Sequence, residues 1–136
     1  MKAAQIAQFG PPSVITNNDL PQPRRGTGQL LVRVKAAGVG NWDALIREGK
    51  VQLQPLPLVL GAELSGIVEG IGADVSGFAV GDQVYGSTNE QFSGAYAEYA
   101  LPFAKMMLST FCDSDWSVSA ASCRINTEHR SEERIL

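Results

Sequence analysis

The residue types that most often bind metals or act as nucleophiles are few in this chain and lie late in it. Cys112 and Cys123 are the only cysteines, and His129 is the only histidine. A catalytic zinc needs about three ligands of the Cys, His or carboxylate type, and these three residues follow no recognised ligand spacing. A Cys-His nucleophilic pair meets the same objection, because nothing in the sequence orients one side chain toward the other. We therefore expect no metal site and no cysteine nucleophile.

A more favourable place for chemistry is the corner at Gly38-Val39-Gly40, where a predicted strand gives way to a short predicted helix. Asn41, Trp42 and Asp43 follow at once and bring an amide, an indole and a carboxylate to one turn. Each also has a structural interpretation. Asn41 can cap the helix, Trp42 can be a core aromatic, and Asp43 can be a first-turn carboxylate favoured by the helix dipole. Both interpretations stay open for Asn41 and Trp42, and the structural one is favoured for Asp43.

Glu63 is a carboxylate in a predicted strand that is rich in glycine. An unpaired carboxylate is costly to bury, so Glu63 is expected to have a cationic partner. We favour the role of a paired framework carboxylate over a direct role in chemistry. The candidate partners are Arg33, Lys35 and Arg47.

The elements that would position these residues are mostly strands, because β-branched residues occur in short runs bounded by Gly, Pro, Asn and Asp. Apolar and polar residues alternate over residues 29–37, which predicts a half-buried strand that ends at the corner. A helix is predicted over residues 42–48, with Gly49 at its end. Many short strands separated by turns indicate a mainly β fold with short helices, in the form of a small barrel. Other strands are predicted over residues 2–7, 58–60, 64–71, 84–85 and 95–101.

Length and composition limit the class of protein. The chain has 136 residues, of which 44% are hydrophobic and 18% charged, with 14 acidic against 11 basic side chains. This is the profile of an ordinary globular protein, and we expect one domain plus a tail. The sequence has no basic stripe for nucleic acid, no apolar run near the roughly 20 residues that span a bilayer, and an N-terminus too polar for a signal peptide. We predict no nucleic-acid partner, no membrane association and a cytoplasmic location.

Several motifs, in order, resemble those of the medium-chain dehydrogenases. They are the opening MKAAQIAQFGPP, the segment AAGVGNWD at 36–43, and SGIVEGIGADVSGFAVGDQVY at 65–85. The segment at 61–66, GAELSG, is similar to the zinc alcohol dehydrogenase signature GHExxG with alanine in place of the histidine. The resemblance covers roughly residues 1–106. It implies a GroES-like, partly open β-barrel and the zinc-independent quinone oxidoreductase branch of the family.

The cysteine and the histidine that bind catalytic zinc in the related alcohol dehydrogenases have no counterpart in this chain. The position of their cysteine is matched by Gly40 and that of their histidine by Ala62, so that only Glu63 remains. The hydroxyl residue that relays the alcohol proton is matched by Trp42, whose indole only donates hydrogen bonds. The structural-zinc lobe, four closely spaced cysteines, would fall near residues 89–94 and is absent. The resemblance therefore implies chemistry without zinc.

Family members that lack zinc transfer hydride directly from NADPH to a quinone or an activated enone, while the protein positions and polarises the reactants. In these enzymes the corner that matches residues 40–46 faces the nicotinamide and the substrate. The resemblance thus gives Asn41, Trp42 and Asp43 as substrate-facing catalytic candidates. It gives Gly40, Asn41 and Ile46 as candidates for cofactor contact. Asn41 can donate to a substrate oxygen, although the family's asparagine stands one place earlier, where this chain has Gly40.

The sequence contains no recognisable nucleotide-binding unit. Such a unit needs a strand, a GxGxxG turn and a helix, and Gly70-Ile71-Gly72 lacks the third glycine. Residues 107–136 stop resembling the family and form a divergent tail whose order stays open. We therefore expect a truncated product, in which a GroES-like domain at 1–106 belongs to an NADPH-dependent quinone reductase-like enzyme and is inactive alone. The alternative is a non-enzymatic GroES-like binding or assembly module, and a homo-oligomer stays open in either case.

Overall fold

Strands predominate in the structure, a computed structural model that describes residues 1–52 and 54–109. Within these residues there is one α-helix, and the mainly β fold class predicted from the sequence is confirmed. The elements in chain order are β1 (Lys2–Ile6), the 3-10 helix η1 (Pro12–Val14), β2 (Ile15–Asp19), β3 (Leu30–Ala37), α1 (Asn41–Arg47), β4 (Leu58–Val59), β5 (Glu63–Ile71), β6 (Gln83–Ser87), β7 (Tyr99–Ala100), the 3-10 helix η2 (Ala104–Met106) and β8 (Met107–Ser109).

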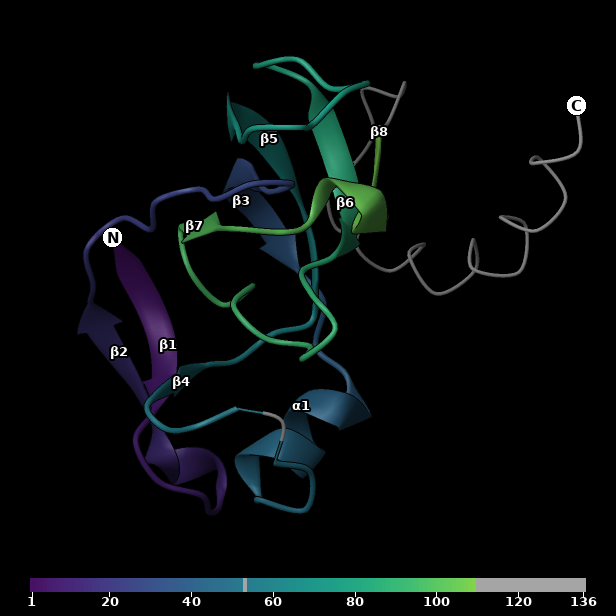
Figure 1. The fold of residues 1–136 in the computed structure, drawn as a ribbon. Coiled ribbons are helices and arrows are strands. Elements are labelled where there is room, and N and C mark those ends of the chain that lie inside the picture. The colour runs from purple at the N-terminus through teal and green to yellow at the C-terminus, as the bar shows by residue number, and fades with distance from the viewer. Residues whose placement is uncertain (53, 110–136) are drawn as a thin grey trace, which may run out of the picture.

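The strands form two antiparallel sheets that do not close into a barrel. The smaller sheet has the order β2-β1-β4, and the larger one has the order β7-β3-β5-β6-β8. Figure 1 shows α1 next to the smaller sheet at one end of the molecule and the larger sheet toward the opposite end. A single antiparallel bridge between Ala3 and Ala97 connects β1 with the segment that leads into β7. The strand pairing therefore confirms the predicted fold, which is GroES-like and only partly open.

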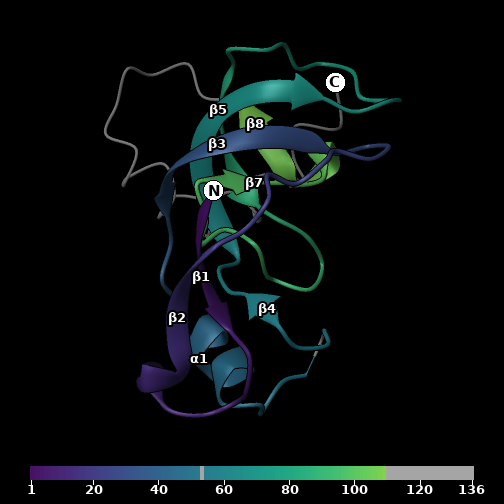
Figure 2. The ribbon, with the colours of Figure 1, turned by 90° about the vertical axis from the view of Figure 1, so that its left-hand side faces the viewer.

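β3 and β5 form the centre of the larger sheet and curve together across the molecule (Figure 2). Their pairing shifts register between Leu31 and Val32 and again between Val34 and Ala36. Irregularities of this kind increase the twist of a strand pair. Leu30 and Leu31 are both buried, so the start of β3 is covered on both faces. The half-buried strand predicted for this segment is thus correct only for its later part.

The apolar interior consists of two clusters of buried residues. Side chains of the larger sheet make up the first, and the second lies between the smaller sheet and α1. Tyr96 packs against both clusters and so joins the two halves of the fold. The first cluster contains Leu30, Val32, Leu64, Val68, Val84, Ala95, Ala100 and Met107, and the second contains Ile6, Ile46, Leu58 and Leu60.

The larger sheet continues past residue 106, the predicted end of the domain. β8 pairs with β6, and Met107 is buried in the first cluster. Residues 110–136 lie outside the described residues, and with them Cys112, Cys123 and His129. Over the described ranges, no helix has the length and apolar character needed to cross a bilayer.

Candidate functional site

The corner identified in the sequence forms where β3 ends and α1 begins. The backbone N–H of Gly38 donates to the carbonyl of Glu63 at 3.0 Å and closes the strand pairing. Gly40 is the N-cap of α1, with extended backbone angles. Asp43 Oδ2 accepts a hydrogen bond from the Gly40 N–H at 2.8 Å, while the Asp43 N–H donates to the Gly40 carbonyl at 3.2 Å. The expected capping role of Asn41 is therefore wrong, because Asp43 closes the helix start and Asn41 is the first helical residue.

Asp43 is buried, and one of its two carboxylate oxygens has no hydrogen bond. Its side chain is 7% exposed, and within the described residues neither Asp43 Oδ1 nor the buried Tyr96 hydroxyl meets a partner with hydrogen-bond geometry. Burial raises the pKa of Tyr96, and the adjacent negative charge of Asp43 raises it further, with a smaller contribution from Glu63. The corner therefore contains a neutral phenol held next to a carboxylate.

Trp42 lies at the surface of the corner, so the expectation of a core aromatic is wrong. The residue is 39% exposed, and its ring meets Phe92 edge to face, with centroids 5.4 Å apart. Val39 beside it is 85% exposed. Aromatic pairs of this geometry stabilise each other beyond their buried area. The corner thus has an apolar rim in which Phe92 supports the Trp42 ring.

The other candidate residues at the corner differ in accessibility. Asn41 is exposed and Gly40 is partly exposed. Ile46 is 2% exposed and packs in the second core cluster. The first turn of α1 therefore offers Asn41 and Trp42 to a ligand, whereas Ile46 contributes to the core beneath them.

The positions that match the zinc ligands of related enzymes lie at this corner as well. Gly40 and Ala62 have no ligand atoms in their side chains, and no cluster of three or more metal-binding side chains occurs among the residues described. The Glu63 side chain lies against Gly38, where an added Cβ would stand 2.8 Å from Glu63 Oε2. Two of the expected partners of Glu63 are engaged elsewhere. Arg33 pairs with Glu69, and Arg47 binds Glu48 and the carbonyl of Gly10.

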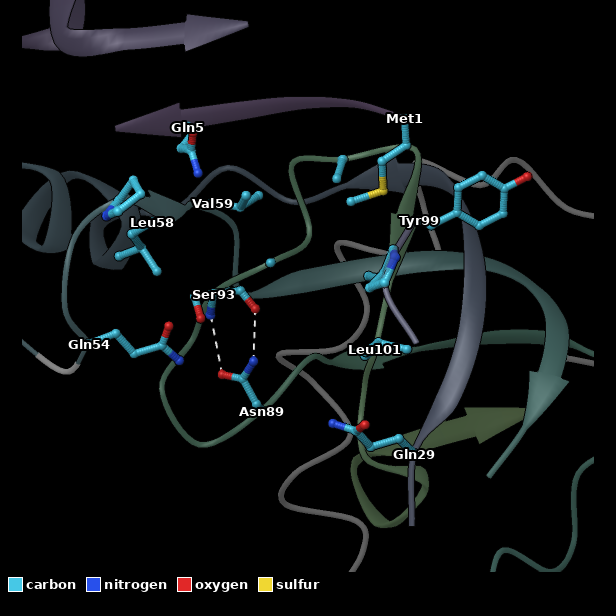
Figure 3. A pocket seen from close by; sticks show the side chains of 15 residues that line it. Met1, Gln5, Gln29, Gln54, Leu58, Val59, Asn89, Ser93, Tyr99 and Leu101 are labelled. Atoms are coloured by element: carbon cyan, nitrogen blue, oxygen red, sulfur yellow. Dashed lines mark hydrogen bonds between the residues drawn. The ribbon is translucent and has the colours of Figure 1, made fainter. Parts of the chain in front are cut away.

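A cavity of about 320 Å³ is lined in part by residues of segment 89–97, among them Asn89 and Ser93 (Figure 3). The Asn89 side chain holds this part of the segment in place. It donates to the Ser93 carbonyl at 2.9 Å and accepts from the backbone N–H groups of Gln91 and Ser93. None of the candidate corner residues lines the cavity, and no charged side chain does. Phe92 and Tyr96 of the same segment contact the corner instead. We regard the corner as the better candidate for chemistry, because it has the carboxylate, amide and indole groups.

Sequence reasoning did not identify Phe92 or Tyr96 as parts of the site. Tyr96 lies in a predicted strand whose alternation showed only that it faces opposite to its neighbours. The contacts of both residues with the corner depend on folding of a segment far from it in sequence. No local pattern in the sequence carries that information.

Comparison with known proteins gives a consistent set of relatives. The model of the alcohol dehydrogenase GroES-like domain matches residues 26–110. The quinone oxidoreductase of Lama guanicoe is 39% identical over 103 residues, which are 74% of this chain and 31% of that protein. The solved quinone oxidoreductase of Coxiella burnetii has a TM-score of 0.83 at 31% identity and covers 89% of this chain and 40% of its own. A mycobacterial protein solved in complex with NADPH has a TM-score of 0.79 at 33% identity, with 89% and 36% covered.

Proposed function

Because the chain belongs to the alcohol dehydrogenase GroES-like domain family, we propose that it supplies the substrate-side domain of a cytoplasmic, NADPH-dependent oxidoreductase that transfers hydride to a quinone or an enone. Two observations support the proposal. Curated relatives are named quinone oxidoreductases, and a similar solved protein binds NADPH. The chain spans about a third of the length of the curated relatives that it matches. We therefore also propose that residues 1–106 are the catalytic domain and that the chain alone does not turn over.

The geometry of the corner is the observation that carries the proposal. The side chain of Asp43 fixes the turn through Gly40, which leaves Asn41 and Trp42 accessible at the first turn of α1. In the proposed reaction Asn41 donates a hydrogen bond to the carbonyl oxygen of the substrate, and Trp42 provides an aromatic wall supported by Phe92. NADPH supplies the hydride when bound. The chain's own residues orient the acceptor and polarise it.

With Gly40 and Ala62 at the positions of the zinc ligands, the substrate carbonyl has to be polarised without a metal. A zinc ion polarises a substrate carbonyl as a Lewis acid, but neither side chain can ligate one. A quinone or an activated enone accepts hydride more readily than a simple ketone, because its negative charge spreads over a conjugated system. We propose that a hydrogen bond from Asn41 is sufficient polarisation for such an acceptor.

Calorimetry with the purified chain tests the proposal first. NADPH is titrated into the chain, with 2′,5′-ADP as a control for its adenosine half, and NADPH oxidation is then followed with a simple quinone. The expected result is no binding and no turnover. Micromolar binding with turnover would show that the chain contains a nucleotide site that we have not identified.

A chimera tests the substrate-side role separately. Residues 1–109 replace the matching segment of the Coxiella burnetii quinone oxidoreductase, which supplies the rest of that protein. We expect NADPH-dependent quinone reduction by the chimera. Asn41→Ala should lower kcat, because an uncharged hydrogen bond made in the transition state contributes about 1 kcal/mol, or several-fold in rate. A folded chimera that binds NADPH but reduces no quinone would contradict the proposed role.

A non-enzymatic binding module is the second candidate, and the exposure of Val39 favours it. Val39 and Trp42 place apolar surface at the same corner, and surface of this kind often marks a protein contact. Size-exclusion chromatography distinguishes the two functions. Self-association abolished by Val39→Ser, together with an inactive chimera, would favour the binding module, whereas a monomer with an active chimera would favour the enzyme.

A further inference from the structure

A second cleft lies at the start of β3, at the opposite end of this strand from the corner. It has a volume of about 600 Å³, and buried Leu31 forms part of its lining. The loop between β2 and β3 provides one wall, and the end of β5 provides the other. No Asp or Glu lines the cleft, whereas two adjacent arginines do. The lining residues are Gln22, Pro23, Arg24, Arg25, Leu31, Ile71, Gly72 and Ala73.

Arg25 is held in a fixed position although it is exposed. Its Nε donates a hydrogen bond to the carbonyl of Ile71 at 2.9 Å. Its guanidinium group lies over Gly70, where an added Cβ would stand 2.9 Å from Nη1 and 3.2 Å from Cζ. Because Nε alone is engaged among the described residues, both terminal nitrogens remain as donors. The side chain is thus ordered before any ligand arrives, which lowers the entropic cost of binding.

Arg24 doubles the positive charge, and neither arginine has an ion pair among the residues described. The two other arginines that the structure describes have carboxylate partners, Arg33 in Glu69 and Arg47 in Glu48. The protein carries a net charge of −3, so a pair of uncompensated guanidinium groups is a local exception. Asp74 directly follows Ala73 of the lining but lines a different pocket, together with Gly28.

We propose that this cleft binds the phosphate group of a small molecule, through Arg24 and the terminal nitrogens of Arg25. Guanidinium groups present planar, paired donors that match the oxygens of a phosphate, and such charged hydrogen bonds are stronger than neutral ones. β3 separates the cleft from the corner by its eight residues, or about 25 Å at about 3.3 Å per residue. The site is therefore distinct from the proposed hydride-transfer site, and the two sites can be tested independently.

Titration of inorganic pyrophosphate into the full 136-residue chain at low salt, followed by calorimetry, tests the proposal. Arg25→Ala should weaken binding by about tenfold, the loss of one charged hydrogen-bonding group. Gly70→Ala gives an independent test, because the added methyl group displaces the Arg25 guanidinium and leaves the net charge unchanged. It should weaken binding as well, and circular dichroism verifies that the variant folds. Arg33→Gln is the matched control, since it also removes one positive charge from the same sheet but outside the cleft.

The proposal would be overturned if pyrophosphate did not bind the chain. It would also be overturned if Arg33→Gln weakened binding as much as Arg25→Ala, because the attraction would then come from net charge alone. Citrate provides the last comparison, since it is a carboxylate of similar charge. Equal affinity for citrate would refute the assignment to phosphate, whereas weaker binding of citrate would support it.

Discussion

The Tyr96 hydroxyl lies next to the Asp43 carboxylate, and the two polar atoms are buried together without the geometry of a hydrogen bond. One comes from the first turn of α1 and the other from the segment that leads into β7. Tyr96 also packs against both core clusters. The pair thus joins the corner to the rest of the fold.

Tyr96→Phe should leave the free energy of unfolding unchanged or raise it. The variant keeps the ring and removes only the hydroxyl, and a buried polar group without a partner costs about 1–3 kcal/mol. Urea unfolding measures the effect. Asp43→Ala is the contrasting variant, since it removes the hydrogen bond to the Gly40 N–H and should lower the free energy of unfolding by about 1 kcal/mol. A Tyr96→Phe protein less stable than Asp43→Ala would show that the hydroxyl does have a favourable partner.

The raised pKa of Tyr96 predicts how stability depends on pH. The folded state holds the phenolic proton more tightly than the unfolded chain, whose tyrosine has a pKa of about 10. This contribution to stability is fully present below pH 10 and is lost as the pH rises above it toward the folded-state pKa. Unfolding measured between pH 9 and 12 should therefore show a steeper decline for the natural protein than for Tyr96→Phe.

Asp43→Asn should lower the pKa of Tyr96, because it removes the negative charge that opposes ionisation of the phenol. The pKa should stay above its ordinary value, since burial is the larger cause and remains in the variant. Ultraviolet titration of the tyrosinate band measures the shift, with Tyr96→Phe as the reference that lacks this ionisation. An unchanged pKa in Asp43→Asn would contradict the placement of the pair.

Gly61→Ala should destabilise the fold more than Gly77→Ala. Both glycines have φ in the left-handed region, +98° and +82°, so each substitution has a backbone cost of about 1–3 kcal/mol. At Gly61 the added Cβ would also overlap the Tyr96 ring and stand 2.8 Å from its backbone nitrogen, whereas at Gly77 no atom of the described residues lies within 4 Å. Thermal unfolding compares the two variants. Equal losses would show that Tyr96 can move away from Gly61.

Arg47→Met should lower the free energy of unfolding by about 1.5–3 kcal/mol, the range for a hydrogen bond to a charged group. Arg47 is buried and donates from Nη1 to the carbonyl of Gly10 at 2.6 Å, which ties the end of α1 to the loop after β1. Lys50→Met is the control, because Lys50 pairs with Glu48 at the surface and exposed ion pairs contribute about 0–1 kcal/mol. A larger loss for Lys50→Met in urea unfolding would refute this ranking.

The sequence was sufficient for the fold class, because alternation and turn residues describe strands locally and several motifs, in order, resemble those of the family. It was not sufficient for the cap of α1. Asn and Asp are about equally good cap residues, so the local sequence could not show that Asp43 bonds to Gly40 while Asn41 begins the helix. The buried side chain of Asp43, two residues after Asn41, is the one that closes the start of α1.

The remaining features of the two sites depend on pairing between distant strands. Arg25 reaches Gly70 because Leu31 pairs with Gly70 across β3 and β5, and this register contains shifts that no local pattern predicts. Phe92 supports Trp42 in the same way, from a segment far along the chain. Of the three partners predicted for Glu63, namely Arg33, Lys35 and Arg47, both arginines pair with other carboxylates, because alternation does not say which of several carboxylates a cation will reach.

Because Ala3 pairs with Ala97, this contact can form only after the ribosome has synthesised most of the domain. β1 leaves the ribosome among the first residues, yet the Lys2 N–H and the Ala4 N–H find their partners at Glu98 and Tyr96. Translation adds about 5–20 residues per second, so this wait is on the order of 10 s. During that interval β1 can pair with β2 and then with β4, but its contacts with Tyr96, Ala97 and Glu98 cannot form. A nascent chain halted before Tyr96 should therefore expose β1 to chaperones, and the two halves of the domain can join only late in synthesis.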